Sequence, residues 1–216
     1  MKRISILGST GSIGCSALDV VASHPDRLKV VGLAAGTNVN GFVQQVRQFK
    51  PQLVAMGSPR SMEEVKEALG SGTNLGEIFG PSGSEGLEAV ALHPDADIVL
   101  CATSGTAALQ AVLAAIRAGK TIALANKEVL VMAGAVMMEE ARIHDATILP
   151  VDSEHNAIHQ CLHGRAVRDV KRLILTASGG PFRDWSVDKL RGVRPDEALN
   201  HPTWNMGPKI TVDSST

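Results

Sequence analysis

RISILGSTGSIG, residues 3–14, is the stretch that decides the fold. Residues 3–7 are typical of a short buried strand, and residues 15–22 predict a helix with one apolar face. The glycines between them follow G-x-x-G-x-x-G spacing, in a strand–turn–helix context that can hold a pyrophosphate. The donors would be backbone N–H groups of the turn and of the helix N-terminus. An ordinary glycine-rich turn is the alternative, but the intact flanking pattern favours nucleotide binding.

Strands and helices alternate along the rest of the first part of the chain. Further strands are expected at 29–35, 53–56, 97–102, 120–125 and 147–151, with a weak one at 77–79. Helices are expected at 40–49, 61–69, 84–92 and 105–118. This alternation indicates right-handed βαβ units and a parallel sheet. Residues 1–150 are therefore expected to form a Rossmann-type, doubly wound α/β domain that binds its ligand beyond the carboxyl ends of the strands.

A second domain is expected from residue 151 to residue 216, because carboxylates suited to a metal follow Pro150. We expect this part to contain a helix at 156–162, strands at 170–176 and 209–212, and short helices within 184–200. It would thus be part of a second α/β domain.

Composition limits the classes of function. The chain has 216 residues, 44% of them hydrophobic, which is enough for a sizeable core. Only 3% are aromatic and the net charge is -1, so a nucleic-acid partner is not expected. The three cysteines are odd in number and far apart, which fits the reducing cytoplasm. Residues 98–116 carry no charge, but polar residues 103–106 interrupt them, so a buried strand and helix are expected and no membrane partner.

Asp152-Ser153-Glu154 follows the strand expected at 147–151. In extended backbone the side chains of residues i and i+2 point to the same side, so both carboxylates could face one Mg²⁺ or Mn²⁺ ion. The alternative is a helix start, with Asp152 or Ser153 as N-cap and Glu154 against the helix dipole. Spacing alone favours the cap. Zinc on the three histidines of 155–163 is not expected, because the first and third are two turns apart.

Two further strand ends carry candidate binding residues. No acid stands at 34–36, so the 2′-phosphate of NADP is allowed there, and Thr37 and Asn38 could donate hydrogen bonds to it. Asn126, Lys127 and Glu128 open a helix after the strand expected at 120–125. Lys127 could anchor a substrate oxygen there or be an ordinary surface lysine, and its position favours the functional role.

The second part of the chain contains another glycine-rich turn, at 177–182. The Ser178 hydroxyl in this turn could meet a phosphate. Residues 201–207 combine His, Trp and Met between two prolines. Such a segment is either a mobile loop that closes over a ligand or a packed turn.

Five motifs occur together in order along the chain: ILGSTGSIG at 6–14, LANKE at 124–128, PVDSEHNAI at 150–158, SGGPF at 178–182 and HPTWNMGPKITVDSS at 201–215. The set resembles the 1-deoxy-D-xylulose 5-phosphate reductoisomerase family, and the resemblance covers the whole chain. It implies an NADPH-dependent enzyme, both oxidoreductase and isomerase, that also needs Mn²⁺ or Mg²⁺. The implied reaction converts the phosphorylated sugar 1-deoxy-D-xylulose 5-phosphate to 2-C-methyl-D-erythritol 4-phosphate in the non-mevalonate isoprenoid pathway.

The resemblance also implies a domain plan and an assembly. Residues 1–150 would be the NADPH-binding domain and residues 151–216 part of the catalytic domain. In the family, an Asn and a Lys for the substrate phosphate, a third metal carboxylate and a C-terminal helical domain follow. The chain is therefore expected to be a fragment with poor activity of its own. A homodimer is expected for the full-length family member.

Matching positions carry the family's residue roles onto this chain. The cofactor would be contacted by Thr10, Gly11, Ser12, Ile13, Gly36, Asn38, Asn126, Glu128 and Gly207. The catalytic residues would be Lys127, Asp152, Glu154 and His201, of which Asp152 and Glu154 bind the metal. The substrate would be bound by Lys127, Ser153, Glu154, Ser178, His201, Trp204 and Ser214.

Two alternatives stay open at this point. One is another dinucleotide-dependent oxidoreductase, of semialdehyde-dehydrogenase type, with Cys101 as nucleophile. The other is a nucleotide-binding fragment without catalytic activity. Loss of activity on thiol alkylation without a metal requirement would favour the first, and NADPH binding without turnover would favour the second.

Overall fold

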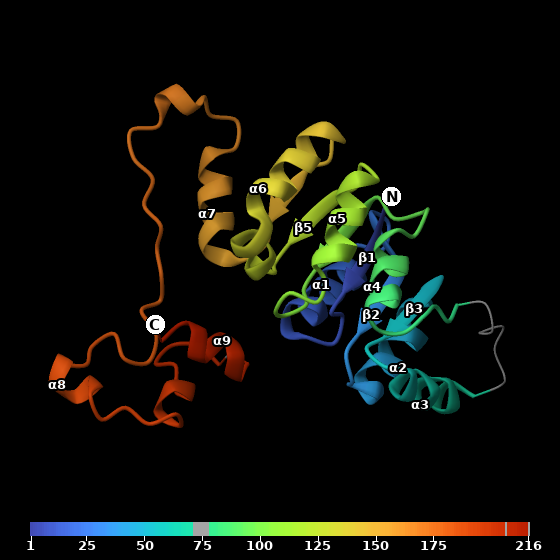
Figure 1. Ribbon diagram of the computed structural model, residues 1–216, viewed down its shortest axis with the longest axis horizontal. Helices are drawn as coiled ribbons and strands as arrows, with labels where there is room; N and C mark the ends of the chain where they lie inside the picture. Colours follow the sequence, from blue (N-terminus) through green and yellow to red (C-terminus); the bar gives the residue numbers. More distant parts are fainter. Residues whose placement is uncertain (71–77, 206, 216) are drawn as a thin grey trace. The chain divides into compact units, whose positions relative to one another are not determined.

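The computed structural model describes residues 1–70, 78–205 and 207–215 (Figure 1). The chain divides into two compact units, Met1–Asp152 and Ser153–Thr216. The roles assigned to two domains at 1–150 and 151–216 stay predictions.

The first unit is built on a six-stranded parallel sheet in the order β3-β2-β1-β4-β5-β6. The strands are β1 (Lys2–Leu7), β2 (Leu28–Ala35), β3 (Leu53–Met56), β4 (Ile98–Cys101), β5 (Thr121–Leu124) and β6 (Ile148–Pro150). Leu7 lies opposite Ala34 of β2 and Cys101 of β4, so the three strands end at one level. The direction of strand order reverses between β1 and β4. Ligands of doubly wound sheets bind outside the carboxyl ends of the strands at this point.

Helices cover both faces of the sheet, so the doubly wound α/β fold is confirmed (Figure 1). One face packs on α1 (Ser12–Ser23), α2 (Val39–Phe49) and α3 (Pro59–Leu69). The other packs on α4 (Gly83–Ala91), α5 (Leu109–Arg117) and α6 (Lys127–Ile143). Ile6 and Leu7 are neighbours in β1 and enter opposite core clusters, as the alternation of side chains along a strand requires.

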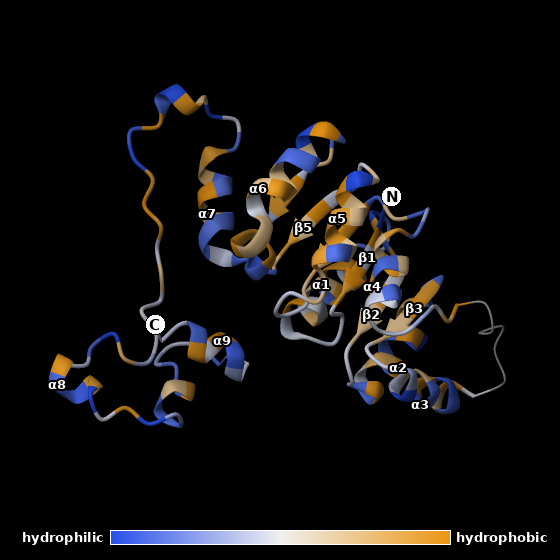
Figure 2. Ribbon diagram, viewed as in Figure 1, coloured by the Kyte–Doolittle hydropathy of each residue, from blue (hydrophilic) through white to orange (hydrophobic). Residues whose placement is uncertain are grey.

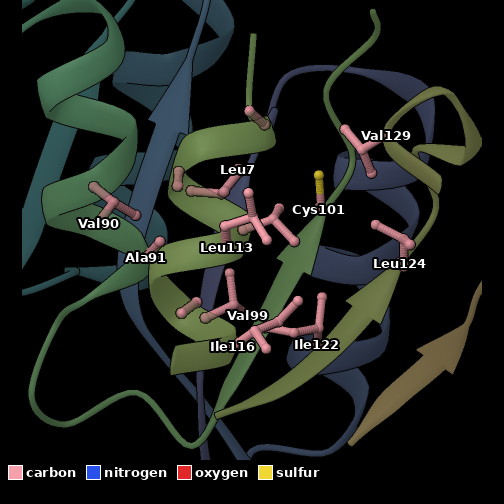
Figure 3. Close-up of a cluster of buried hydrophobic side chains, with 14 of the residues drawn as sticks. Leu7, Val90, Ala91, Val99, Cys101, Leu113, Ile116, Ile122, Leu124 and Val129 are labelled. Atoms are coloured by element: carbon pink, nitrogen blue, oxygen red, sulfur yellow. The ribbon is translucent and has the colours of Figure 1, made fainter. Parts of the chain in front are cut away.

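The core is apolar and close-packed where the middle strands meet α5. Side chains of β1, β4 and β5 converge with Leu113 and Ile116 of α5, and the sulfur of Cys101 lies among them (Figure 3). The ribbon of β5 is coloured largely hydrophobic in Figure 2. The apolar runs of the sequence therefore form strands that are buried on both faces, as expected for a parallel sheet.

Local capping explains where several helices begin. The Asn38 side chain accepts a hydrogen bond from the Gly41 N–H and starts α2. Ser58 does the same for Ser61 at the start of α3, where Pro59 occupies the first turn. The helix expected at 105–118 begins only at Leu109, because Gly105 has a positive φ of 68° and residues 105–108 form turns.

The second unit contains short helices and connecting segments. They are α7 (Ser153–Leu162), η2 (Val167–Asp169), α8 (Val187–Leu190), η3 (Glu197–Leu199) and α9 (Pro208–Asp213). Among the described residues of this unit there is no strand.

Two strand predictions in this unit are wrong. Residues 170–176 pair with no strand in the described part of the chain, and Leu173, Ile174 and Leu175 are exposed. An apolar run becomes a strand only where a partner strand takes up its backbone groups. Residues 209–212 lie within α9, which Pro208 opens at a position where a missing N–H costs nothing.

Part of the weak strand expected at 77–79 lies outside the described residues, because Glu77 does. Phe79 makes an isolated parallel bridge to Val54. Nowhere in the described ranges does a helix have both the length and the apolar character that a membrane span requires.

Candidate functional site

A cavity of about 570 Å³ opens at the carboxyl end of the sheet, at the point where the strand order reverses. Its lining comes from the last residues of β2 and β3, from the segments that follow β1, β2, β3 and β4, and from the start of α4. Three of the predicted cofactor residues, Thr10, Gly11 and Gly36, belong to it. Sequence reasoning missed other lining residues: Gly57, Ser84, Thr103 and Ser104. The position of Gly57, Thr103 and Ser104 just after β3 and β4 was the available signal.

Two glycines of the first glycine-rich turn are required by packing. Gly8 has a φ of +89°, and a Cβ there would lie 2.6 Å from the Ala102 carbonyl oxygen. A Cβ on Gly14 would overlap the Gly8 carbonyl oxygen and lie 2.6 Å from that of Ser9. Gly8 therefore lets β1 end against the β4 segment, and Gly14 lets α1 cross the turn closely.

Gly11 is different from the other two glycines, because the protein itself leaves room for a side chain. A Cβ at Gly11 would meet no atom closer than 3.4 Å. Its φ of -76° and ψ of 169° suit any residue. Since Gly11 lines the cavity, the missing side chain leaves space for a ligand to approach the backbone.

The turn presents free backbone donors to this cavity. The N–H groups of Gly8 and Ser9 donate to the Ala34 carbonyl at 2.8 and 2.9 Å. The Thr10 N–H has no partner in the described part of the chain, and the first N–H groups of α1 have none within a helix. Neither a capping side chain nor an acidic residue occupies the first turn of α1. This end of α1 can therefore hold an anionic group such as a phosphate.

Asn126 is buried, and its side chain stabilises the loop beside the cavity. Its side-chain oxygen accepts a hydrogen bond from the Val129 N–H at 3.3 Å and caps α6. Its amide nitrogen donates to Thr103 Oγ1 at 3.1 Å and to the Gly105 carbonyl at 2.7 Å. In this structure Asn126 therefore fixes the segment after β4. A direct contact with the cofactor stays a prediction, as it does for Glu128.

Lys127 and Asp152, far apart in sequence, are brought together in the first unit. Lys127 Nζ lies 3.0 Å from Asp152 Oδ2, and both side chains are partly exposed. Two residues predicted for metal and substrate thus form one ion pair beside the end of β6.

Glu154 belongs to the second unit, in the first turn of α7. The Ser153 hydroxyl lies 3.4 Å from Glu154 Oε2. The extended backbone expected for residues 152–154 is wrong, because α7 begins at Ser153, three residues before the expected start at 156. No group of three or more His, Cys, Asp or Glu side chains suited to a metal occurs in the ranges that the structure describes. The metal role of Asp152 and Glu154 stays a prediction.

Ser178, His201 and Ser214 lie close together in the second unit. His201 Nδ1 accepts from the N–H groups of Thr203 (3.1 Å) and Trp204 (2.9 Å). The proton of the neutral ring is therefore on Nε2, which donates to Ser178 Oγ at 3.0 Å. A Cβ on Gly180 would overlap the Ser214 carbonyl oxygen. Only a glycine allows this contact between the second glycine-rich turn and α9.

The Ser178 hydroxyl keeps a proton for a ligand. Ser178 Oγ accepts from His201 and from the Gly180 N–H at 3.3 Å. Both bonds use lone pairs of the oxygen, so the hydroxyl hydrogen can donate to an anionic oxygen.

Trp204 and Gly207 lie two residues before and one residue after Met206, which is outside the described residues. The Trp204 side chain is 60% exposed, and Gly207 is the N-cap of α9. A wider, open hollow of about 870 Å³ lies between α7 and residues 169–174 of the second unit. Its lining includes none of the predicted site residues, so we assign it no role in the chemistry.

Cys101 is fully buried in the core beneath the cavity. Burial raises the pKa of its thiol, and the sulfur lies 3.7 Å from Thr103 Oγ1. A buried thiol with a raised pKa is a poor nucleophile. The semialdehyde-dehydrogenase alternative, which needed Cys101 as nucleophile, is therefore not favoured.

Comparison with known proteins decides the family. Residues 4–134 match the family model of 1-deoxy-D-xylulose 5-phosphate reductoisomerase, and residues 148–216 match that of its C-terminal domain. The chain belongs to the 1-deoxy-D-xylulose 5-phosphate reductoisomerase family. The predicted resemblance is thereby confirmed.

Individual relatives of this reductoisomerase family agree over the whole chain. The chloroplastic 1-deoxy-D-xylulose 5-phosphate reductoisomerase of Oryza sativa subsp. japonica is 53% identical over 215 residues, 100% of this chain and 45% of the relative. That of Pelotomaculum thermopropionicum is 51% identical, over 100% of this chain and 55% of the relative. The chain thus spans about half the length of the curated relatives it matches.

Solved reductoisomerase structures have the same fold. A DOX-P reductoisomerase in complex with NADPH, fosmidomycin and magnesium is 40% identical, with a TM-score of 0.88 over 100% of this chain and 54% of that one. The Zymomonas mobilis enzyme in complex with NADPH gives 0.84 at 40% identity, over 99% and 54% of the two chains.

Proposed function

We propose that the protein carrying this chain converts 1-deoxy-D-xylulose 5-phosphate to 2-C-methyl-D-erythritol 4-phosphate with NADPH and a divalent metal. The observation that carries the proposal is the first glycine-rich turn, which opens free N–H donors into a cavity in a chain of this family. Cavity, fold and family all favour the same cofactor, since two related solved structures are complexes with NADPH.

The residues present fit NADPH. Thr10, Ser12 and Ile13 would hold the pyrophosphate through backbone N–H groups of the turn and the start of α1. Gly11, whose N–H donates to the Gly8 carbonyl, would contact the cofactor by letting it approach the backbone. Gly36 and Asn38 follow β2, where the adenosine ribose of a dinucleotide is bound in this fold. The absence of an acid at 34–36 avoids repulsion of a 2′-phosphate.

The residues present also fit a hard cation by the chemistry of their donors. Asp152 and Glu154 offer carboxylate oxygens, which Mg²⁺ and Mn²⁺ prefer. When bound, the cation supplies positive charge for substrate oxygens and NADPH supplies the hydride. Lys127, held by Asp152, would place its ammonium beside a substrate oxygen. Its charge would stabilise negative charge that develops on that oxygen.

In the second unit, Ser178, His201 and Ser214 would bind the substrate, largely near its phosphate. The support is the shared contact around Gly180 and the hydroxyl hydrogen left on Ser178. His201 would orient that hydroxyl through its Nε2–H, while its other nitrogen holds the Thr203–Trp204 segment. Ser153, Trp204 and Gly207 would complete the substrate and cofactor contacts.

The first experiment measures steady-state NADPH oxidation with 1-deoxy-D-xylulose 5-phosphate and Mn²⁺. It uses this chain and a chain extended to the length of the relatives. Turnover by the extended chain is the expected result. NADPH binding without turnover in both would support a nucleotide-binding protein without this activity, and no binding of NADPH would overturn the proposal altogether.

The second experiment tests the metal ligands. Glu154→Gln keeps the size of the side chain but removes its charge, so Mn²⁺ binding, followed by water proton relaxation, should weaken at least about tenfold. The matched control is Asp188→Asn, which makes the same change at the second residue of α8 in the same unit. Equal Mn²⁺ affinity in both variants would indicate that Glu154 is a helix-start residue and not a metal ligand. A cytoplasmic location and a homodimer stay predictions.

A further inference from the structure

Gln45 is a polar residue on the buried face of α2. Its neighbours on this face, Phe42, Val43 and Val46, are apolar, and Gln45 is only 9% exposed. Its Nε2 donates a hydrogen bond of 2.9 Å to the Ser9 carbonyl in the first glycine-rich turn. A weaker contact of 3.8 Å joins the same nitrogen to Cys15 Sγ.

The other end of this side chain is unsatisfied. Gln45 Oε1 is buried and has no hydrogen-bond partner among the described residues. The amide cannot be turned to relieve this, because Oε1 would then face the Ser9 carbonyl oxygen. A buried carbonyl without a partner costs stability, so an apolar residue of similar size would suit the packing of α2 better. The bond to Ser9 therefore explains Gln45 in a way that packing does not.

The Ser9 carbonyl and the Thr10 N–H belong to one trans peptide unit, so they point in opposite directions. Gln45 holds the carbonyl on the α2 side, and the Ser9 N–H is held by Ala34 of β2. The Thr10 N–H therefore points away from α2. Thr10 lines the cavity, and its N–H has no partner in the described chain.

We infer that Gln45 is a positioning residue that fixes the Ser9–Thr10 peptide so that the Thr10 N–H is presented to the pyrophosphate of the nucleotide. This inference rests on the proposed nucleotide binding. It identifies α2 as an element that stabilises the phosphate-binding turn, although Gln45 itself does not line the cavity.

The test compares ligands with and without a pyrophosphate. Gln45→Met keeps the length of the side chain but removes both the donor and the unsatisfied oxygen. We expect ADP and NADPH to bind about tenfold more weakly, and adenosine 2′-monophosphate to bind within about twofold of the unmodified chain. The melting temperature should not fall. The matched control is Gln44→Met, an exposed position of the same helix, which should change none of these values.

Two results would overturn the inference. One is unchanged ADP affinity in Gln45→Met. The other is an equal loss for ADP and adenosine 2′-monophosphate together with a lower melting temperature, which would indicate a merely structural role. Failure of the unmodified chain to bind ADP or NADPH would instead refute the proposed function.

A second measurement does not depend on how the variant folds. In the unmodified, isotope-labelled chain, the Thr10 amide should exchange quickly with solvent and become protected when ADP binds, but not when adenosine 2′-monophosphate binds. Protection of this amide before any ligand is added would contradict the inference.

Discussion

The two ends of the parallel sheet in the first unit differ in their polar contacts: charged side chains make them at the amino end, and an uncharged cavity opens at the carboxyl end. At the amino end, Arg3 Nη1 pairs with Asp95 at 2.7 Å, and its backbone N–H donates to Asp97 at 2.8 Å. Lys120 Nζ, before β5, donates to two backbone carbonyls at 2.6 and 2.9 Å. At the carboxyl end, the residues that line the cavity within the described chain are all uncharged.

This difference shows which end of the sheet is stabilised by polar contacts within the protein and which end leaves space and backbone donors for a ligand. Charged side chains tie β1, β4 and β5 together at the amino end. At the carboxyl end, backbone N–H groups and the start of α1 are left to bind an anion, so recognition there depends on backbone geometry. Changes at one end should therefore alter stability, and changes at the other should alter binding.

The largest effect is expected from Gly14→Ala. The new Cβ would overlap the Gly8 carbonyl oxygen, and both contacting groups are backbone that cannot move aside. We expect the free energy of unfolding to fall by about 3 kcal/mol and NADPH binding to be lost. Urea unfolding and nicotinamide fluorescence measure the two effects. A chain with unchanged stability would show that the turn is looser than the structure indicates.

The next effect separates binding from stability at the same turn. Gly11→Ala adds a methyl group that the protein accommodates but that faces the cavity. NADPH affinity should fall about ten- to hundredfold, because the pyrophosphate can no longer approach the backbone. The melting temperature should be nearly unchanged. Gly14→Ala is the comparison, and equal losses of stability in the two variants would contradict this division of roles.

At the amino end, Lys120→Met should lower stability without changing NADPH affinity. The ammonium is partly buried, and burial lowers its pKa, yet it donates hydrogen bonds to the carbonyls of His93 and Ala96. Removing it leaves these carbonyls without their donor, at a cost of about 1–2 kcal/mol. Lys29→Met, an exposed lysine of β2, is the control. Weaker NADPH binding in Lys120→Met would mean that the two ends are coupled.

The smallest effect concerns acid stability. The Arg3 backbone N–H and then its side chain hydrogen-bond Asp97 and lower the pKa of that carboxyl. Because the folded pKa lies below the unfolded one, the contribution is present above the unfolded pKa and is lost as the pH falls below about 4. Asp97→Asn should therefore flatten the loss of stability as the pH falls below about 4 in urea titrations. Asp26→Asn, in an exposed turn, should leave it unchanged.

Much of the first unit could be predicted because its signals are local. The strand–turn–helix pattern and the alternation of apolar runs predicted both ends of each of the six strands to within one residue. The same reasoning failed at 170–176 and 209–212. Apolar content there predicts burial, but a strand also needs a partner in register, and Pro208 starts a helix instead.

The residues of the candidate site also divide into those that local sequence patterns mark and those whose contacts join distant parts of the sequence. Thr10, Gly11 and Gly36 were predictable, because the glycine pattern and the strand ends mark them in the sequence. The pairing of Lys127 with Asp152 and of His201 with Ser178 was not, since each joins residues more than 20 positions apart. The burial of Cys101 agrees with the buried strand expected at 97–102.

The sequence by itself determined the α/β class, the phosphate-binding turn and the family, because these follow from short patterns and residue identities. Only the tertiary structure decided that strand order reverses between β1 and β4, and that Gln45 of α2 holds the Ser9 carbonyl across 36 residues. The physical reason is that hydrophobic periodicity specifies which face of an element is buried. It does not specify which partner lies against that face, and the direction of each backbone donor depends on that partner.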